Sequence, residues 1–198
     1  MMTIELFLRG RAEHKQRIAD RLLHDLITED SAPESVLAAA RALTHVVVHE
    51  PPVWATGGAD EQPRYLVRLT VPGSWNNNEF GAYVIPRITR SIAEFEEDPD
   101  RLYRDPHCVV QIVGLREHSV GTLGQVTTST EITKLMTEEF RASGEHREAP
   151  EGSVVDPVCG MAVDLATATI TVTHEGTTYA FCAPVCRKVF VEENAIGA

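Results

Sequence analysis

The sequence predicts an α+β protein in which two fused β-α-β units form a four-stranded sheet with helices on one face, followed by a small cysteine-containing ββα module. Three observations lead to this prediction. One pattern of strand, helix and strand occurs twice before residue 140, a polar segment without apolar periodicity follows, and three of the four cysteines lie beyond that segment. We therefore expect a β-α-β domain at 1–140, a linker at 141–152 and a separate module at 153–198.

The first copy of the pattern begins with a strand at 3–10, in which apolar and polar residues alternate. An amphipathic helix is expected at 14–27, because its apolar residues recur at helical spacing. A second helix is expected from Pro33, since proline is tolerated in the first turn of a helix, and a valine-rich strand at 44–50 follows. The apolar stripe of the first helix consists of Ile18, Leu22, Leu23, Leu26 and Ile27.

The second copy has a strand at 64–71, a helix at 76–97 and a strand at 107–115. Asn76 is expected to cap the helix in a capping box with Glu79. Pro86 predicts either a kink in this helix or its true first turn. A further helix at 128–140 is expected to close the domain. The helix at 76–97 is expected to bury Val84, Ile88, Ile92 and Phe95.

Composition and charge exclude several classes of protein. The chain of 198 residues has a formal net charge of -11 and no stripe of basic residues, so we expect no nucleic-acid partner. No segment approaches the ~20 continuous apolar residues that span a bilayer, so we expect no membrane partner. Four cysteines in this pattern do not resemble a secreted disulfide framework. We therefore expect a soluble, cytoplasmic protein whose clustered cysteines serve metal or redox chemistry.

The cysteines of the tail have a spacing that is typical of metal ligands. A hairpin turning at Glu175-Gly176 is expected before a short helix that starts near Cys182. Residues i and i+4 of a helix share a face, so Cys182 and Cys186 could bind one ion, with Cys159 coming from an earlier turn. Three thiolates suit Zn(II) or Cu(I). The fourth ligand is left open, with His174 and Met161 as the candidates.

The position of these cysteines near a helix N-terminus is expected to lower a thiol pKa, which favours the thiolate that a metal needs. Arg187 and Lys188 add positive charge nearby. The same cysteines also fit two other interpretations. The cysteines could be small buried apolar residues, because cysteine is among the most buried residue types, or Cys182 and Cys186 could form a disulfide as a redox pair.

The tail resembles the YHS domain, a small metal-associated module related to the TRASH domain, over 154–194. Two stretches carry the resemblance, "DPVCGM" at 156–161 and "YAFCAPVCRKVF" at 179–190, with a hairpin between them. The matching positions are Asp156, Pro157, Cys159, Gly160, Met161, Tyr179, Phe181, Cys182, Cys186 and Phe190.

This resemblance implies that the module binds a soft or heavy metal, with copper the common association and zinc or mercury as alternatives. It implies Cys159, Cys182 and Cys186 as the ligands, and a metal donor or acceptor protein as a partner. The family usually continues with an acidic-Pro-aromatic helix cap, whereas this sequence continues with "ENAIGA".

The first 140 residues resemble the tautomerase superfamily. The resemblance rests on "LFLRGR" at 6–11, on "VVVHEPPVWATGG" at 46–58 and on the parallel "REHSVGTLGQ" at 116–125 of the second copy. Family chains that hold two such units assemble as trimers, so the resemblance implies a homo-oligomer, a trimer. The residues that carry the match are Arg11, Pro51, Trp54, Gly57 and Gly58.

The chemistry of that family is where the sequence departs from the pattern. Its enzymes use an amino-terminal proline as general base, whereas this sequence begins Met1-Met2-Thr3, and Pro63, which opens the second copy, has an amide nitrogen. Arg11 is a candidate for binding a carboxylate. We therefore expect a soft-metal-binding protein on an inactive tautomerase-like scaffold. The alternative is a tautomerase or isomerase acting on a small keto or enol acid, with the YHS module as a regulator.

Overall fold

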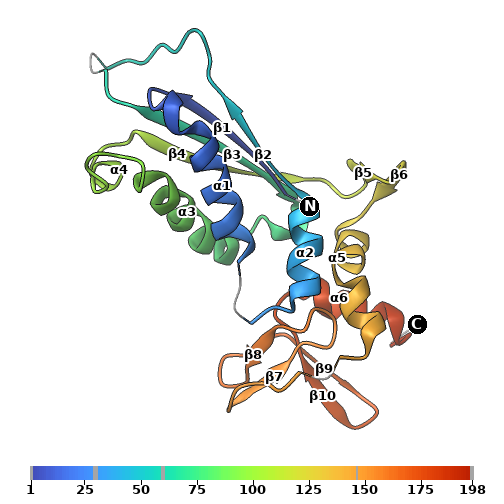
Figure 1. The fold of residues 1–198 in the computed structure, drawn as a ribbon. Helices are drawn as coiled ribbons and strands as arrows, with labels where there is room; N and C mark the ends of the chain where they lie inside the picture. Colours follow the sequence, from blue (N-terminus) through green and yellow to red (C-terminus); the bar gives the residue numbers. More distant parts are fainter. Residues whose placement is uncertain (1, 29–30, 59–60, 146, 197–198) are drawn as a thin grey trace. The chain divides into compact units, whose positions relative to one another are not determined.

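The computed structural model describes residues 2–28, 31–58, 61–145 and 147–196 (Figure 1). Its contacts divide the chain into two compact units. Unit 1 comprises Met1–Thr28 and Leu43–Arg116, and unit 2 comprises Glu29–Ala42 and Glu117–Ala198. The predicted division into modules at 1–140 and 153–198, with a linker between them, stays a prediction.

Unit 1 contains a mixed four-stranded sheet with the strand order β2-β1-β3-β4. Strand β1 (Met2–Arg9) is parallel to β2 (Thr44–His49), and β3 (Arg64–Pro72) is parallel to β4 (Cys108–Leu115). The two pairs join through β1 and β3, which are antiparallel. Two β-α-β units are therefore fused into one sheet, as the sequence predicts.

The helices of unit 1 cover one face of this sheet. Helix α1 (Lys15–Ile27) follows the short 3-10 helix η1 (Ala12–His14), and it contacts α3 (Asn78–Ala93), as Figure 1 shows. The 3-10 helix η2 (Gly73–Trp75) precedes α3, and the single turn α4 (Arg101–Arg104) follows it. Alternate residues of β1 and β3 point to this face and are buried, among them Ile4, Leu6, Leu8, Val67 and Leu69.

Two local predictions for α3 are corrected by the structure. Its N-cap is Asn77 and not Asn76, because the Asn77 side chain accepts a hydrogen bond from the Phe80 amide at 2.8 Å. Glu79 then falls outside the capping-box position. Pro86 lies inside the helix and does not mark its first turn. A run of three asparagines offers equivalent caps, so the sequence could not select one of them.

Unit 2 contains two helices that contact each other, α2 (Glu34–Ala42) and α5 (Ser129–Ser143). A short antiparallel hairpin, β5 (Val120–Thr122) and β6 (Gln125–Thr127), precedes α5. The start of α5 is fixed by a capping box between Thr128 and Glu131. This arrangement satisfies backbone donors that a helix N-terminus would otherwise leave unpaired.

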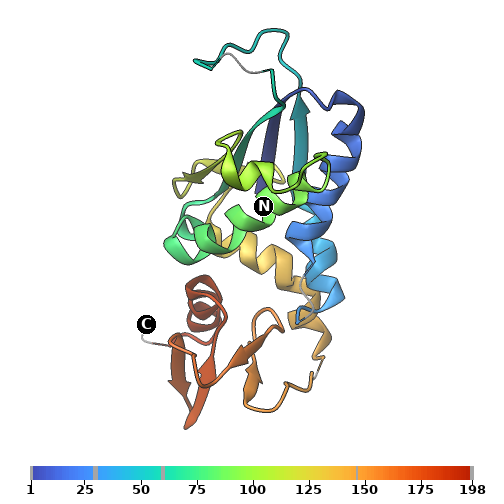
Figure 2. The same ribbon diagram turned by 90° about the vertical axis from the view of Figure 1, so that its left-hand side faces the viewer.

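The rest of unit 2 is a small module of two strand pairs and one helix. Strand β7 (Ser153–Val155) pairs with β8 (Ala162–Asp164), and β9 (Thr171–His174) pairs with β10 (Thr177–Ala180). Helix α6 (Pro184–Glu193) lies against the second hairpin (Figure 2). The turn at Glu175-Gly176 is confirmed, whereas the sequence did not predict the β7–β8 pair.

Among the described residues, no helix combines the length and the apolar character that crossing a membrane requires.

Candidate metal centre

The structure brings the three predicted cysteine ligands together. The sulfur atoms of Cys159 and Cys182 are 3.4 Å apart, and those of Cys182 and Cys186 are 3.8 Å apart. Ligand atoms of Asp156 and all three cysteines lie within 4.8 Å of one another. An ion held ~2.3 Å from each sulfur at tetrahedral angles sets the sulfurs ~3.8 Å apart, so this cluster fits a thiolate-bound metal.

Cys159 is positioned by a tight turn between β7 and β8. The amide of Gly160 donates to the Asp156 carbonyl at 2.8 Å, and the Asp156 amide donates to the Met161 carbonyl at 2.8 Å. Gly160 adopts a φ of 73°, a conformation that favours glycine. The turn therefore places Cys159 inside the module, with only 5% of the residue exposed.

Cys182 and Cys186 do not both lie on the helix, which corrects the predicted arrangement. Helix α6 begins at Pro184, so Cys182 precedes it and Cys186 sits in its first turn. The reason is Pro184, which lacks a backbone N-H and is favoured at the first helical position. The two sulfurs still meet, because the extended backbone at Ala183, with φ of -148°, leads directly into the helix.

Asp156 is the cluster member that the sequence did not single out as a site residue. Its carboxylate is fully buried, with 0% exposed, and it accepts hydrogen bonds from the amides of Val158, Cys159 and Cys182. Burial, with a further contribution from the charge of Cys159, raises the pKa of the Asp156 carboxyl to about 6. An aspartate that precedes a proline and a cysteine is typical of a turn in which the side chain accepts nearby amides, and this pattern could have indicated its role.

The three thiols share their protons unequally. Hydrogen bonds with Cys182 and then Cys186 lower the pKa of the Cys159 thiol well below its usual value, in spite of burial. The hydrogen bond with Cys159 raises the pKa of Cys182 and of Cys186. For Cys182 and Cys186 this direction is opposite to the lowering predicted for a thiol near a helix N-terminus, because each shares a hydrogen bond with the Cys159 sulfur. An ion that binds all three must displace the protons of the other two.

The two candidates for a fourth ligand lie in different places. The Met161 side chain packs against the apolar core of the module. His174 ends β9, and its ring meets the edge of Phe190 at a centroid distance of 6.3 Å. Among the described residues, the group of acidic, cysteine and histidine side chains around the sulfurs contains Asp156 and not His174.

The three cysteines of the centre differ in their exposure to solvent. Cys159 and Cys186 belong to the apolar core of the module, whereas Cys182 is exposed. The core around the two buried cysteines excludes water, and this favours sulfur ligation of a soft ion over competition from water. An incoming ligand would therefore reach the ion beside Cys182. The core consists of Val158, Cys159, Phe181, Cys186, Val189 and Phe190.

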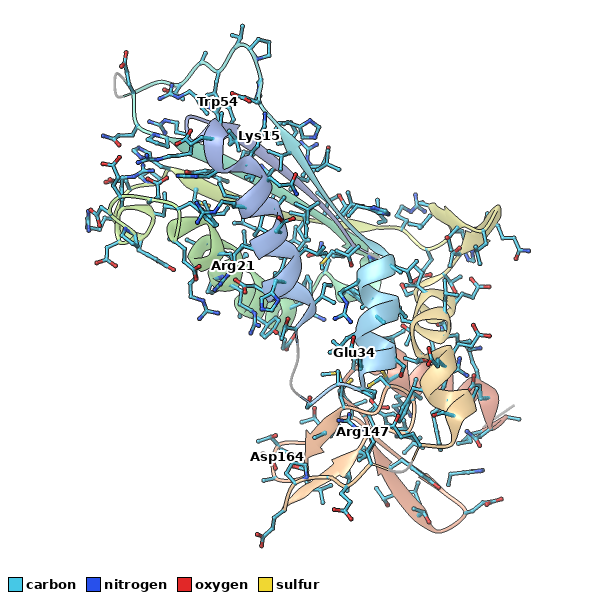
Figure 3. All side chains as sticks on the ribbon, in the orientation of Figure 1. Lys15, Arg21, Glu34, Trp54, Arg147 and Asp164 are labelled. Carbon is cyan, nitrogen blue, oxygen red and sulfur yellow. The ribbon has the colours of Figure 1, made fainter. Side chains whose placement is uncertain are left out.

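The cysteine turn also packs on other segments of unit 2. Arg147, labelled in Figure 3, donates from Nη1 to the carbonyls of Ser31 at 2.7 Å and Gly160 at 2.8 Å. Helix α6 contacts α5, where Lys134 pairs with Glu192 at 2.9 Å. The loop that carries Cys159 is therefore fixed from outside the ββα module as well as from within it.

The residues that the sequence analysis singled out in unit 1 lie outside the cysteine cluster. Arg11 is in the left-handed region, with φ of 60°, and its Nη2 pairs with Glu97 Oε1 at 3.1 Å. The carbonyl of Pro63 accepts a hydrogen bond from Arg101 Nη2 at 3.1 Å. Met1 lies outside the described residues. Cys108 lies on β4 and not in the cysteine cluster, and burial raises the pKa of its thiol to about 11.

Comparison of the sequence with models of known families finds no match, and comparison with curated protein sequences finds none. Solved structures show similarity to part of this chain. Pt0534 inactivated by 2-oxo-3-pentynoate is 16% identical with a TM-score of 0.47, and the match covers 64% of this chain and 94% of that protein.

Two further structures show the same kind of similarity. N1, a member of the cis-3-chloroacrylic acid dehalogenase family, is 20% identical with a TM-score of 0.46, over 72% of this chain and 92% of that one. A wild-type fused 4-OT, an asymmetric trimer, is 14% identical with a TM-score of 0.44, over 63% and 94% of the two chains. These are tautomerase-superfamily structures, and the fold class of this chain rests on its own strand order and strand directions.

Proposed function

We propose that this protein binds a soft metal ion, Cu(I) or Zn(II), through Cys159, Cys182 and Cys186, and that it buffers or transfers this ion. The observation that carries the proposal is the convergence of three sulfurs, with separations of 3.4 and 3.8 Å, from a turn and a helix start far apart in the sequence. The same residues carry the resemblance to the YHS and TRASH-like modules. Thiolates are the ligands that soft ions prefer.

Transfer is supported by the unequal exposure of the cysteines. Because Cys182 is exposed and the other two are buried, a thiolate from a donor or acceptor protein could approach the ion beside Cys182. Exchange of one ligand at a time then moves the ion between proteins. Reduced thiols are needed for this chemistry, so we place the protein in the cytoplasm.

The test is an anaerobic titration of the reduced protein with Cu(I) and with Zn(II) against a competing chelator. We expect the wild type to bind one ion tightly. The double variant Cys159→Ser, Cys182→Ser should lose this binding, because a single thiolate remains. The matched control is Cys108→Ser, which removes a half-buried cysteine of unit 1 and should bind as the wild type does.

Weak binding by both the wild type and the double variant would contradict the proposal. The close sulfurs would then indicate a thiol redox pair, and mass spectrometry of air-exposed protein would show the loss of two hydrogens. Tight binding that survives in the double variant would place the metal elsewhere in the chain and would also contradict the proposal.

For the β-α-β part we propose a scaffold role. Arg11, the candidate for binding a carboxylate, is engaged by Glu97, and Pro63 has no basic nitrogen. The second candidate function is an isomerase acting on a small keto or enol acid, with the cysteine module as a regulator. The fused β-α-β topology favours this candidate, but function has to be argued from a site and not from a fold.

We propose that the scaffold forms a homo-oligomer, a trimer, through the open face of its sheet. Side chains on this face alternate with the buried ones. They include the exposed Val47, which pairs with Glu5, and the exposed Val109, which pairs with Leu66. Exposed valines gathered on a sheet face are typical of a surface that another protein copy covers. Glu5 and Arg68 pair at 3.6 Å between these apolar positions.

The double variant Val47→Glu, Val109→Glu is expected to convert the trimer to monomers. Two buried carboxylates without partners in each copy would destabilise the interface by several kcal/mol, on the order of 2 or more for each charge. Light scattering coupled to size-exclusion chromatography measures the mass. The control is Val53→Glu, whose valine is 80% exposed and is not part of the sheet. A monomeric wild type would contradict the proposal.

A further inference from the structure

Asp156 connects the two segments that carry the sulfurs. Its Oδ1 accepts hydrogen bonds from the amides of Val158 at 2.8 Å and Cys159 at 3.4 Å. Its Oδ2 accepts the amide of Cys182 at 2.9 Å. One buried carboxylate therefore ties the β7–β8 turn to the start of α6, although 26 residues separate Asp156 from Cys182.

These hydrogen bonds occupy most of the capacity of the carboxylate. An ionised carboxylate has about four lone-pair positions, and three of them are directed at backbone amides. A direct bond to a metal, at ~2.0 to 2.2 Å, would pull Oδ2 toward the sulfurs and away from the Cys182 amide. That amide belongs to a residue that must itself hold the ion, so ligation by Asp156 would disturb the placement of Cys182.

The charges around the ion also argue against direct ligation by Asp156. Three thiolates already exceed the charge of a monovalent or divalent ion, and Cys159 and Cys186 are buried. A fourth anion bound to the same ion would leave additional uncompensated charge in a region of low dielectric, which is strongly unfavourable. Three amide donors hold the carboxylate where it lies, without any bond to the metal.

We propose that Asp156 is a positioning residue and not the fourth ligand, so that the ion is held in an all-sulfur shell. This inference rests on the proposed metal-binding function and makes it more specific. Such a shell selects soft ions of the Cu(I) class over ions that prefer oxygen ligands. Selection of soft ions arises because Asp156, the carboxylate of the cluster, is occupied by backbone amides, among them those of Cys159 and Cys182. It is therefore not free to offer oxygen to the ion.

X-ray absorption spectroscopy of the full-length Cu(I)-loaded protein tests whether the ion has only sulfur ligands. We expect a first shell that contains only sulfur, in the wild type and in Asp156→Asn. An oxygen neighbour in the first shell of the wild type would overturn it, and loss of that neighbour in Asp156→Asn would identify Asp156 as its source. Because the wild-type spectrum decides this point alone, the test remains valid if the variant fails to fold.

Chelator competition with Cu(I) tests the positioning role. Asp156→Asn puts an N-H donor where the carboxylate accepts an amide, so we expect affinity to fall ~10- to 100-fold, the usual effect of losing an outer-shell partner. The matched control is Asp164→Asn (labelled in Figure 3), whose carboxylate accepts the Ala166 amide at 2.9 Å in the same module. It should bind as the wild type does.

Equal affinity of Asp156→Asn and Asp164→Asn would overturn the positioning role. This outcome differs from failure of the proposed function itself, in which the wild type would show no tight binding of Cu(I). Retention of the sulfur-only spectrum in Asp156→Asn, together with the lower affinity, supports positioning, because loss of a ligand would change the spectrum as well.

Discussion

Replacing Arg101 by methionine is expected to lower the free energy of unfolding of unit 1 by ~3 to 5 kcal/mol, the usual effect of removing one partner of a buried ion pair. Arg101 Nη2 lies 2.8 Å from Glu96 Oε2, and these side chains are only 9% and 2% exposed. Arg101 also contacts His107 Nδ1 at 2.6 Å and the Pro63 carbonyl at 3.1 Å. The variant would leave the Glu96 carboxylate buried with the Tyr65 hydroxyl as its remaining donor in this network.

Urea unfolding followed by tryptophan fluorescence measures this effect, because Trp54 and Trp75 both belong to unit 1. The matched control is Arg104→Met on the same turn of helix. Arg104 pairs with Asp98, but these side chains are 59% and 54% exposed, so we expect little change in the free energy of unfolding. Equal effects of the two variants would show that the buried network does not stabilise the unit.

The buried network explains why part of unit 1 could not be predicted. The sheet was predictable, since β1 and β3 alternate apolar and polar residues and the pattern occurs twice. The turn α4 was not, because its four residues carry no periodicity. Arg101 and Arg104 look alike in the sequence, and only the tertiary structure buries the first and exposes the second.

The sequence predicted the three cysteine ligands of the candidate centre, but it did not predict the residue that positions them. The number and spacing of the cysteines indicated Cys159, Cys182 and Cys186, because a site for a soft metal requires several thiolates, and cysteine spacing can be read from the sequence. The turn around Asp156 has a local sequence pattern, but its hydrogen bond with the Cys182 amide joins residues 26 positions apart and has no sequence signature. The start of α6 was placed too early because helical spacing outweighed the signal of Pro184.

The packing of the cysteine turn leads to the second large prediction. Gly160 has a φ of 73°, and a Cβ at this position would lie 2.4 Å from Pro33 Cγ and 2.8 Å from the Phe140 ring. Gly160→Ala therefore combines left-handed strain of ~1 to 2 kcal/mol with overpacking of ~1 to 3 kcal/mol. We expect the module to lose ~2 to 5 kcal/mol of stability, and the neighbouring Cys159 to be displaced.

Hydrogen exchange of peptides from 153–193 and Cu(I) competition measure the two consequences of Gly160→Ala, which are faster exchange and weaker binding. The matched control is Gly176→Ala in the β9–β10 turn, where φ is 80° and no atom lies within 4 Å of the added Cβ. It carries only the left-handed strain, ~1 to 2 kcal/mol, and it should leave Cu(I) affinity unchanged. If both variants behave alike, contact with Pro33 and Phe140 does not hold the cysteine turn in place. A larger effect at Gly160 would mean that metal affinity depends on segments of unit 2 that contribute no ligand.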